Sequence, residues 1–246
     1  FPCTREEFNG AWEDRFTYDF VMDQYQTSLA TGKLGAFMQE LMLRITSAEE
    51  RLIQDSEIRW YSRKALLQAK NNFNFYITTD FATKAKQHND FSVISVWAHN
   101  ANGDWFWVDG ICEKQTMDKN IDDLFRLSSL YRPQQVGIEV SGQQKGFVSW
   151  IQNEMINRNV WFPLASDSNA GEPGIRPNTN KLVRFNNVVP LFKARKVFFP
   201  IEKRKTPELL EMYDELSLVS PSGFRSKHDD FADTISMLAS LTPWKP

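Results

Sequence analysis

The sequence has little of what would mark three large classes of protein. It has only two cysteines in 246 residues, and the distance between Cys3 and Cys112 suits neither a disulfide framework nor a cysteine zinc site. No apolar run approaches the roughly 20 residues that span a bilayer. Residues 141–146 hold too few glycines for a phosphate-binding loop, and no P-loop motif occurs elsewhere. We therefore do not expect a disulfide-rich secreted protein, a membrane-spanning protein or an ATPase within this chain.

Positive charge is not in excess either. Lysine and arginine number 29 against 31 acidic residues, which gives a formal charge of −2. A protein of this charge that binds nucleic acid must gather its basic residues on one face, and its binding should be weak and sensitive to salt. Hydrophobic residues make up 41% and aromatic residues 13% of the chain, which is enough to bury a core.

Residues 1–70 are predicted to form a helical arm. Helical patterns cover residues 18–29 and 34–45, and the spacings Thr4…Glu7 and Ser47…Glu50 suit capping boxes, in which side chains bind the unpaired amides of a helix start. The chain opens with Phe1 rather than Met, so we expect a fragment of a longer protein or a processed form. The hydrophobic period changes near residue 71, where we place the boundary of a second region, residues 71–246.

The second region is predicted to be an α/β domain with a mixed central sheet. Aromatic and β-branched residues predict strands over residues 75–81, 92–99, 105–112, 136–140 and 160–164. A hairpin turn is predicted at 100–103 and a loop at 166–178. Helices are predicted at 120–130, 145–157, from 181, at 207–216 and from 229. In this order, the first and fourth strands can lie side by side and parallel.

Three acidic positions fall where this topology would bring them together. Asp80 ends the first strand and Glu139 ends the fourth, and such sheets bind ligands beyond the carboxyl ends of parallel strands. Asp229 and Asp233 are one helical turn apart on one face, while Asp230 is rotated away. Carboxylates that meet repel one another unless they share a cation, and hard oxygen ligands suit Mg²⁺ or Mn²⁺. Two such ions roughly 3.5–4 Å apart would support hydrolysis of a phosphodiester.

Each of these residues also has a purely structural interpretation. Asp80 alone would more often begin a turn, and Glu139 could lie on an exposed strand face. Acids at 229–233 are typical of a helix start, where they cap amides and face the positive end of the helix dipole. His228 could orient water or only accompany the nearby acids. The set as a whole, rather than any one acid, favours a metal site.

Basic residues follow the predicted loop. Lys181 and Arg184 lie on one face of a predicted helix, with Lys193 and Arg195 nearby, which favours a stripe that follows DNA phosphates. A solvated helix face has the same pattern. Lys145 is a further candidate for DNA contact.

The acidic segments resemble the carboxyl-terminal half of tailed-phage large terminases. The resemblance rests on residues 77–82 (ITTDFA), 137–141 (GIEVS) and 227–233 (KHDDFAD). Residues 35–40 (GAFMQE), followed by the acidic segment at 47–50, also look like the connector between the ATPase and nuclease domains of these proteins. Each motif is short, and their order and separations over nearly the whole chain provide the specificity.

The resemblance implies a ribonuclease-H-like fold of the resolvase and integrase superfamily, with an N-terminal helical arm from an upstream ATPase domain. It implies an endonuclease that cuts concatemeric double-stranded DNA to start and end viral genome packaging. Asp80, Glu139 and Asp229 would be catalytic metal ligands and Asp233 a further ligand, with Asp230 and His228 as auxiliary residues. The implied cofactors are two Mg²⁺ or Mn²⁺ ions. The implied partners are double-stranded DNA, the portal protein and the small terminase subunit, in the host cytoplasm and transiently at the procapsid portal, with no membrane.

Two alternatives stay open at this point. The first is another ribonuclease-H-like nuclease, such as a junction resolvase, which would act as a dimer on branched DNA. The second is a non-catalytic module that docks on DNA or on the portal. The docking module predicts that Asp80→Ala changes no activity and that no divalent ion binds.

Overall fold

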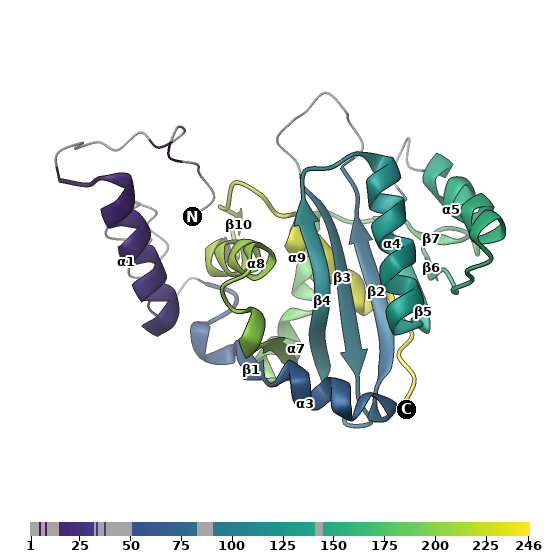
Figure 1. Cartoon of the computed structure of the whole chain (residues 1–246), viewed down its shortest axis with the longest axis horizontal. Helices are drawn as coiled ribbons and strands as arrows, with labels where there is room; N and C mark the ends of the chain where they lie inside the picture. Colours follow the sequence, from purple (N-terminus) through teal and green to yellow (C-terminus); the bar gives the residue numbers. More distant parts are fainter. Residues whose placement is uncertain are drawn as a thin grey trace.

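A six-stranded mixed sheet forms the centre of the computed structural model (Figure 1). The structure describes residues 15–31, 51–82, 91–140 and 145–246, together with residues 5, 8, 33 and 37. The strand order is β1-β8-β4-β3-β2-β5. The bounds are β1 Arg59–Tyr61, β2 Asn74–Asp80, β3 Ser92–His99, β4 Trp105–Glu113, β5 Gln135–Ile138 and β8 Val197–Pro200. The predicted α/β class, with a mixed sheet flanked by helices, is confirmed.

The remaining elements surround this sheet. The helices are α1 Tyr18–Thr31, α3 Arg63–Gln68, α4 Met117–Tyr131, α5 Lys145–Arg158, α6 Lys181–Asn186, α7 Val189–Lys193, α8 Pro207–Leu218 and α9 Asp230–Ser236. Short strands form two further pairs, β6 Ser166–Asp167 with β7 Gly174–Ile175, and β9 Val219–Ser220 with β10 Gly223–Phe224. Single 3₁₀ turns lie at Asp55–Glu57, Lys70–Asn72, Ile201–Lys203 and Met237–Ser240. No helix in the described parts of the chain is long and apolar enough to cross a membrane.

Strand β2 lies between β3 and the edge strand β5. It pairs antiparallel with β3, which pairs antiparallel with β4. The hairpin turn between β3 and β4 forms as predicted, because Asn100 Oδ1 accepts hydrogen bonds from the amides of Asn102 and Asp104, and Gly103 adopts a φ of 80°. On its other side β2 pairs in parallel with β5, with Thr79 opposite Ile138. This predicted parallel pair puts the ends of the two strands, and the acids that follow, next to each other.

Both faces of the sheet are covered, so the inner strands are apolar on both sides. Every residue of β3 is buried. From β2, Phe75 and Ile77 belong to the core under α4, while Tyr76 belongs to the core that includes α8 and α9. Helices α4 and α9 lie on opposite faces of the sheet (Figure 1). The polar ends of the strands are therefore the part of the sheet that can meet a ligand.

Two local predictions were wrong. Residues 160–164 form no regular strand, and only an isolated parallel bridge joins Leu164 to Val136. Pro163 has no amide to donate, and its carbonyl accepts the Val136 amide at 2.8 Å, so pairing stops after one bridge. The predicted loop at 166–178 contains the parallel pair β6 and β7.

The predicted arm is described only in part. The helix expected at 18–29 is confirmed as α1, which buries Val21, Tyr25 and Leu29 in the same core as α8. Strand β1 pairs with β8 at the edge of the main sheet, so residues 59–61 are part of it. Apart from Phe37, the helix predicted at 34–45 lies outside the described residues, as do the capping box at 47–50 and most of the box at 4–7. The boundary near residue 70 stays a prediction.

Candidate active site

Carboxylates from three elements gather beyond the ends of β2 and β5. Asp80 is the last residue of β2 and Glu139 follows β5 directly. Asp229 is the N-cap of α9, and Asp233 lies in its first turn. We call these four residues the acid cluster. The sequence-predicted metal ligands are thus brought to one region of the molecule.

Local contacts hold the strand ends in this position. Thr79 Oγ1 donates to the Gly137 carbonyl at 3.2 Å across the parallel pair. A Cβ at Gly137 would lie 2.8 Å from Ile175 Cδ1, so glycine allows β7 to approach β5 closely. The Val140 amide then donates to the Ile175 carbonyl at 2.9 Å. Glu139 is therefore held at the end of β5 and beside β7 by its bridge to Ile175.

Two cations of α6 bridge the acid cluster. Lys181 Nζ lies 2.7 Å from Asp229 Oδ1 and 2.7 Å from Asp233 Oδ2. Arg184 Nη1 lies 2.8 Å from Glu139 Oε2, and its Nη2 lies 2.9 Å from Asp233 Oδ1. Asn180 fixes the start of α6, because its side chain accepts the Val183 amide at 2.9 Å. Their predicted DNA contacts stay a prediction, since the structure places both cations against acids.

The charges in the cluster shift one another's pKa values. Burial raises the pKa of Asp80 well above its usual value, and the carboxylates of Asp233 and Glu139 raise it further. Burial also raises the pKa of Asp233, although Lys181 and Arg184 oppose that change. Burial alone would lower the pKa of Lys181, but the carboxylates of Asp233 and Asp229 outweigh it and the pKa rises. The cluster is therefore a compact, strongly coupled group of charges.

The donor atoms of the acid cluster fit a hard divalent cation. They are all carboxylate oxygens, the ligands that Mg²⁺ and Mn²⁺ prefer. In the described part of the chain, the Asp80 carboxylate has no hydrogen bond or ion pair. Within the same residues, however, no three Asp, Glu, His or Cys side chains converge closely enough to hold one ion. In this arrangement the acids converge on Lys181 and Arg184 rather than on one another.

The auxiliary candidates lie at the edge of the cluster. Asp230 Oδ2 accepts the Phe91 amide at 3.3 Å, on a different side of the α9 start from the Lys181 contacts. The buried ring of His228 packs edge-on against Phe91, with centroids 4.8 Å apart. Lys145 opens α5, but its side chain is outside the described residues. Lys193 pairs with Glu57 instead of extending a basic stripe.

Sequence reasoning missed the acids of α8. Glu211, Asp214 and Glu215 are all buried on this helix. Burial raises the pKa of Glu215 well above its usual value, while hydrogen bonds from the amides of Ala232 and Phe231 act in the opposite direction. Their spacing at i, i+3 and i+4 puts them on one face of the helix, which in a sequence is typical of a solvated face, so no local signal indicated their burial.

A hollow of about 230 Å³ adjoins the acid cluster at Arg184, and we call it the α6 hollow. Its lining is mostly polar and comes from β6, β7, α6 and the end of the chain: Asp167, Ser168, Ile175, Arg176, Pro177, Asn178, Thr179, Arg184, Asn187, Ser236, Met237, Ala239 and Ser240. Arg176 is exposed, and its guanidinium makes no hydrogen bond or ion pair within the described residues. It is thus a cation beside the cluster whose charge is not already paired.

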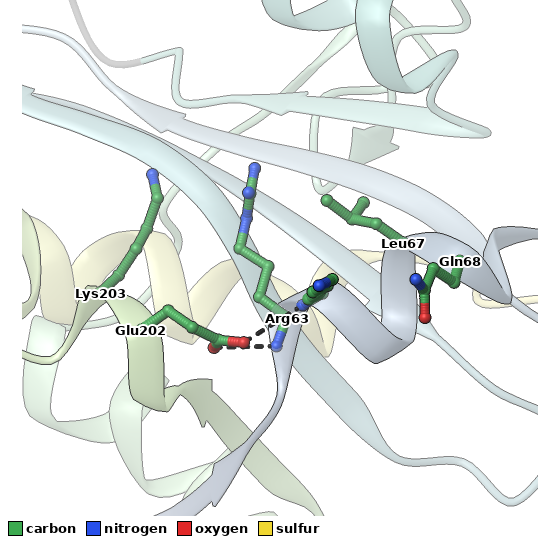
Figure 2. Close-up of a pocket in the computed structure, with 6 residues that line it drawn as sticks. Arg63, Leu67, Gln68, Glu202 and Lys203 are labelled. Atoms are coloured by element: carbon green, nitrogen blue, oxygen red, sulfur yellow. Dashed lines mark hydrogen bonds between the residues drawn. The ribbon is translucent and has the colours of Figure 1, made fainter.

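A second hollow, of about 380 Å³, lies between α3 and the turn after β8 (Figure 2). Two of its cations are neutralised within the protein. Arg63 and Lys203 both contact Asp109, and Glu202 accepts the backbone amides of Arg63 and Lys64 at the start of α3. Helix α3 crosses the end of the sheet at which β2 begins, opposite Asp80 (Figure 1). This hollow is a weaker candidate for a functional site.

Comparison with known proteins identifies the fold. The terminase nuclease domain of human cytomegalovirus, soaked with manganese and bound to an inhibitor, is 13% identical over 77% of this chain and 95% of that chain, with a TM-score of 0.55. The chain has the ribonuclease-H-like fold of the terminase nuclease domains. No protein-family model matches the sequence, and the search of curated proteins finds no match.

Two other solved structures are similar at lower TM-scores. The large terminase nuclease of thermophilic phage G20c, with bound cobalt, is 20% identical over 69% of this chain and 82% of that chain, with a TM-score of 0.45. The yeast mitochondrial Holliday junction resolvase Ydc2 is 13% identical over 89% of this chain and 91% of that chain, with a TM-score of 0.35. At 13% identity, the likeness to the cytomegalovirus domain establishes the fold alone, and function must be argued from the site.

The buried acid Glu211 gives a prediction for stability against pH. Burial and the neighbouring Asp214 raise its pKa from 4.5 to about 7. Between these values the unfolded chain is ionised and the folded chain is protonated, so this group lowers stability as pH rises. Glu211→Gln should therefore gain stability over the wild type as pH increases from 5 to 8, by a few kcal/mol at most at about 1.4 kcal/mol per pKa unit. Urea unfolding at each pH measures the free energy of unfolding of both proteins. A difference between them that stays constant with pH would contradict the raised pKa of Glu211.

Proposed function

We propose that this chain is the metal-dependent endonuclease domain of a viral large terminase. One observation carries the proposal: the ends of β2 and β5 and the start of α9 bring Asp80, Glu139 and Asp229 together on this fold. Lys181 and Arg184 neutralise part of the cluster. The carboxylate of Asp80 has no ion pair among the described residues, and like charges beside it destabilise its ionised form unless a cation is bound. The fold and the resemblance of the motifs support the same activity. The substrate is concatemeric double-stranded DNA, cut at the start and end of genome packaging.

We assign roles from the positions of the side chains. Asp80, whose carboxylate has no hydrogen bond or ion pair among the described residues, would be the shared ligand of two Mg²⁺ or Mn²⁺ ions. Glu139 and Asp229 complete the two sites. Asp233 is mostly enclosed by Lys181 and Arg184 and serves as an auxiliary ligand. Bound ions of this kind activate water and stabilise the leaving oxygen of a phosphodiester.

The two bridging cations give the site two states. Without an ion, Lys181 and Arg184 neutralise Glu139, Asp229 and Asp233. When the carboxylates turn to a metal, these cations lose part of their partners and can face the phosphates of DNA. This exchange accounts for cations that both contact acids in the structure and are predicted to bind DNA. Phosphate contacts carry little sequence information, so cutting should show little sequence preference.

The wider role follows from the resemblance alone. The upstream ATPase domain, the small terminase subunit and the portal protein are proposed partners. The proposed location is the host cytoplasm, with transient docking at the procapsid portal. The manganese-soaked cytomegalovirus nuclease domain supports the choice of a divalent ion, as a property of a protein with the same fold.

Substitution of the acid cluster tests the activity. Asp80→Asn, Glu139→Gln and Asp229→Asn should each reduce plasmid cleavage in Mn²⁺ or Mg²⁺ by at least about 100-fold, since even residues that only support metal ligands cost 10–100-fold. EDTA should abolish cleavage by the wild type. Asp118→Asn, an exposed acid in the first turn of α4, is the matched control and should cut normally.

The same assay distinguishes the alternatives. A folded wild type that cuts no DNA with either ion, and binds neither ion, would contradict the nuclease proposal and favour the docking module. Strong preference for four-way junctions over linear duplex, by a dimer, would favour a junction resolvase.

The α6 hollow gives a prediction for DNA binding. Because Arg176 is exposed beside the cluster and lacks an internal partner among the described residues, Arg176→Ala should weaken binding to duplex DNA and reduce the salt dependence by about one phosphate contact. Arg59→Ala is the control, since Arg59 is exposed on β1 at the opposite edge of the sheet from β5. Fluorescence anisotropy at several salt concentrations, with Ca²⁺ to prevent cutting, measures the DNA affinity of each variant and its salt dependence. Equal losses in the two variants would remove Arg176 from the proposed DNA path.

A further inference from the structure

Helix α9 begins without the capping bond that its sequence predicts. Asp229 is the N-cap residue, and an aspartate there normally accepts the amide of the second or third helical residue. In the structure its side chain accepts neither amide. Its Oδ1 instead lies 2.7 Å from Lys181 Nζ, within the acid cluster. The two amides that Asp229 would cap belong to Phe231 and Ala232.

Glu215 of α8 accepts both of these amides. Phe231 N donates to Glu215 Oε1 at 3.1 Å, and Ala232 N donates to Oε2 at 2.6 Å. Each carboxylate oxygen thus binds one amide of the first turn of α9. Glu215 is only 1% exposed, so water cannot readily replace it. A buried amide that loses its acceptor therefore destabilises this end of the helix.

We propose that Glu215 is a positioning residue that caps α9 in place of Asp229 and thereby keeps the Asp229 carboxylate in the acid cluster. If Glu215 were absent, Asp229 would be the acceptor nearest in sequence to the two amides. Turning to cap them would withdraw its carboxylate from Lys181 and from the site. The effect on metal binding rests on the proposed function. The capping of α9 by Glu215 in place of Asp229 does not depend on that function.

Other features of α9 are compatible with this division of roles. Thr234 Oγ1 lies 3.0 Å from Ser95 Oγ and ties the helix to β3, while Phe231, Ala232 and Ile235 are buried in the core. These contacts fix the body of α9 against the sheet. The capping bonds of Glu215 fix its first turn, from which Asp229 and Asp233 extend. A small change at this turn would therefore move a metal ligand without unfolding the helix.

The test compares Glu215→Ala and Glu215→Gln with Glu211→Gln, a control that alters a buried acid one turn earlier on α8. Glu215→Ala should weaken Mn²⁺ binding and reduce kcat by 10- to 100-fold, as for a lost second-layer contact. Glu215→Gln keeps one acceptor oxygen and should recover part of the loss. Glu211→Gln should match the wild type in Mn²⁺ binding and in kcat at pH 7. Unchanged Mn²⁺ binding and kcat in folded Glu215→Ala would overturn the positioning role.

Hydrogen exchange of the Phe231 and Ala232 amides provides a readout that does not depend on activity. In Glu215→Ala these amides should stay partly protected, because Asp229 now caps them. In Glu215→Ala with Asp229→Ala, protection at these amides should fall at least tenfold further while the amides of β3 keep theirs. Equal protection in the single and double variants would mean that Asp229 does not cap these amides when Glu215 is absent, and would overturn the proposal.

A double-mutant cycle on Mn²⁺ affinity completes the test. In the Asp229→Ala background, Glu215→Ala should cause no further loss, because no Asp229 carboxylate remains to be withdrawn. Independent, multiplicative losses would mean that Glu215 acts by another route and would overturn the proposal. If the wild type cuts no DNA but the exchange pattern appears as expected, the proposed function fails and the capping role stands.

Discussion

The arrangement of the site depends on Asp233, whose carboxylate lies between Lys181 and Arg184. This residue is 3% exposed, and its two oxygens bind one cation each. Removing one partner of a buried pair typically costs about 3–5 kcal/mol, because a charge is left without compensation. Only the pair with Arg184 approaches that case, since its side chain is 16% exposed against 42% for Lys181. Through the same cations, Asp233 is linked to Glu139 beside β5 and to Asp229 at the start of α9. The network therefore joins α6, α9 and the sheet, and any ion that binds must compete with it.

Two groups of acids on neighbouring helices have different physical roles. The acid cluster faces cations and the edge of the sheet, where hard oxygen ligands can be exchanged between a lysine, an arginine and a metal. The acids of α8 are enclosed by apolar residues, and Glu215 uses both oxygens to bind backbone amides of α9. In the proposed site, the acid cluster would supply the metal ligands, and Glu215 would support the turn that holds them. The neutral overall charge of the chain is consistent with acids and bases that are matched locally rather than spread as a basic surface.

Much of the fold could be predicted from the sequence because its signals are local. The apolar runs of β2, β3 and β4 and the turn at Asn100 lie close together along the chain, and their order allows β2 and β5 to pair. From that pairing, the proximity of Asp80 and Glu139 followed. The strand predicted at 160–164 does not form because Pro163 accepts one bond but cannot donate the next. The roles of Lys181, Arg184 and Glu215 could not be predicted, because their partners are 16 to 49 residues away and meet only through the packing of α6, α8 and α9.

The most direct test of the account is a crystal structure of the protein soaked in Mn²⁺, with anomalous scattering used to locate the ions. The account predicts manganese between the carboxylates of Asp80, Glu139 and Asp229, with Lys181 or Arg184 released from at least one of its present partners. Manganese bound elsewhere, with the contacts of both cations to the acid cluster intact, would contradict it.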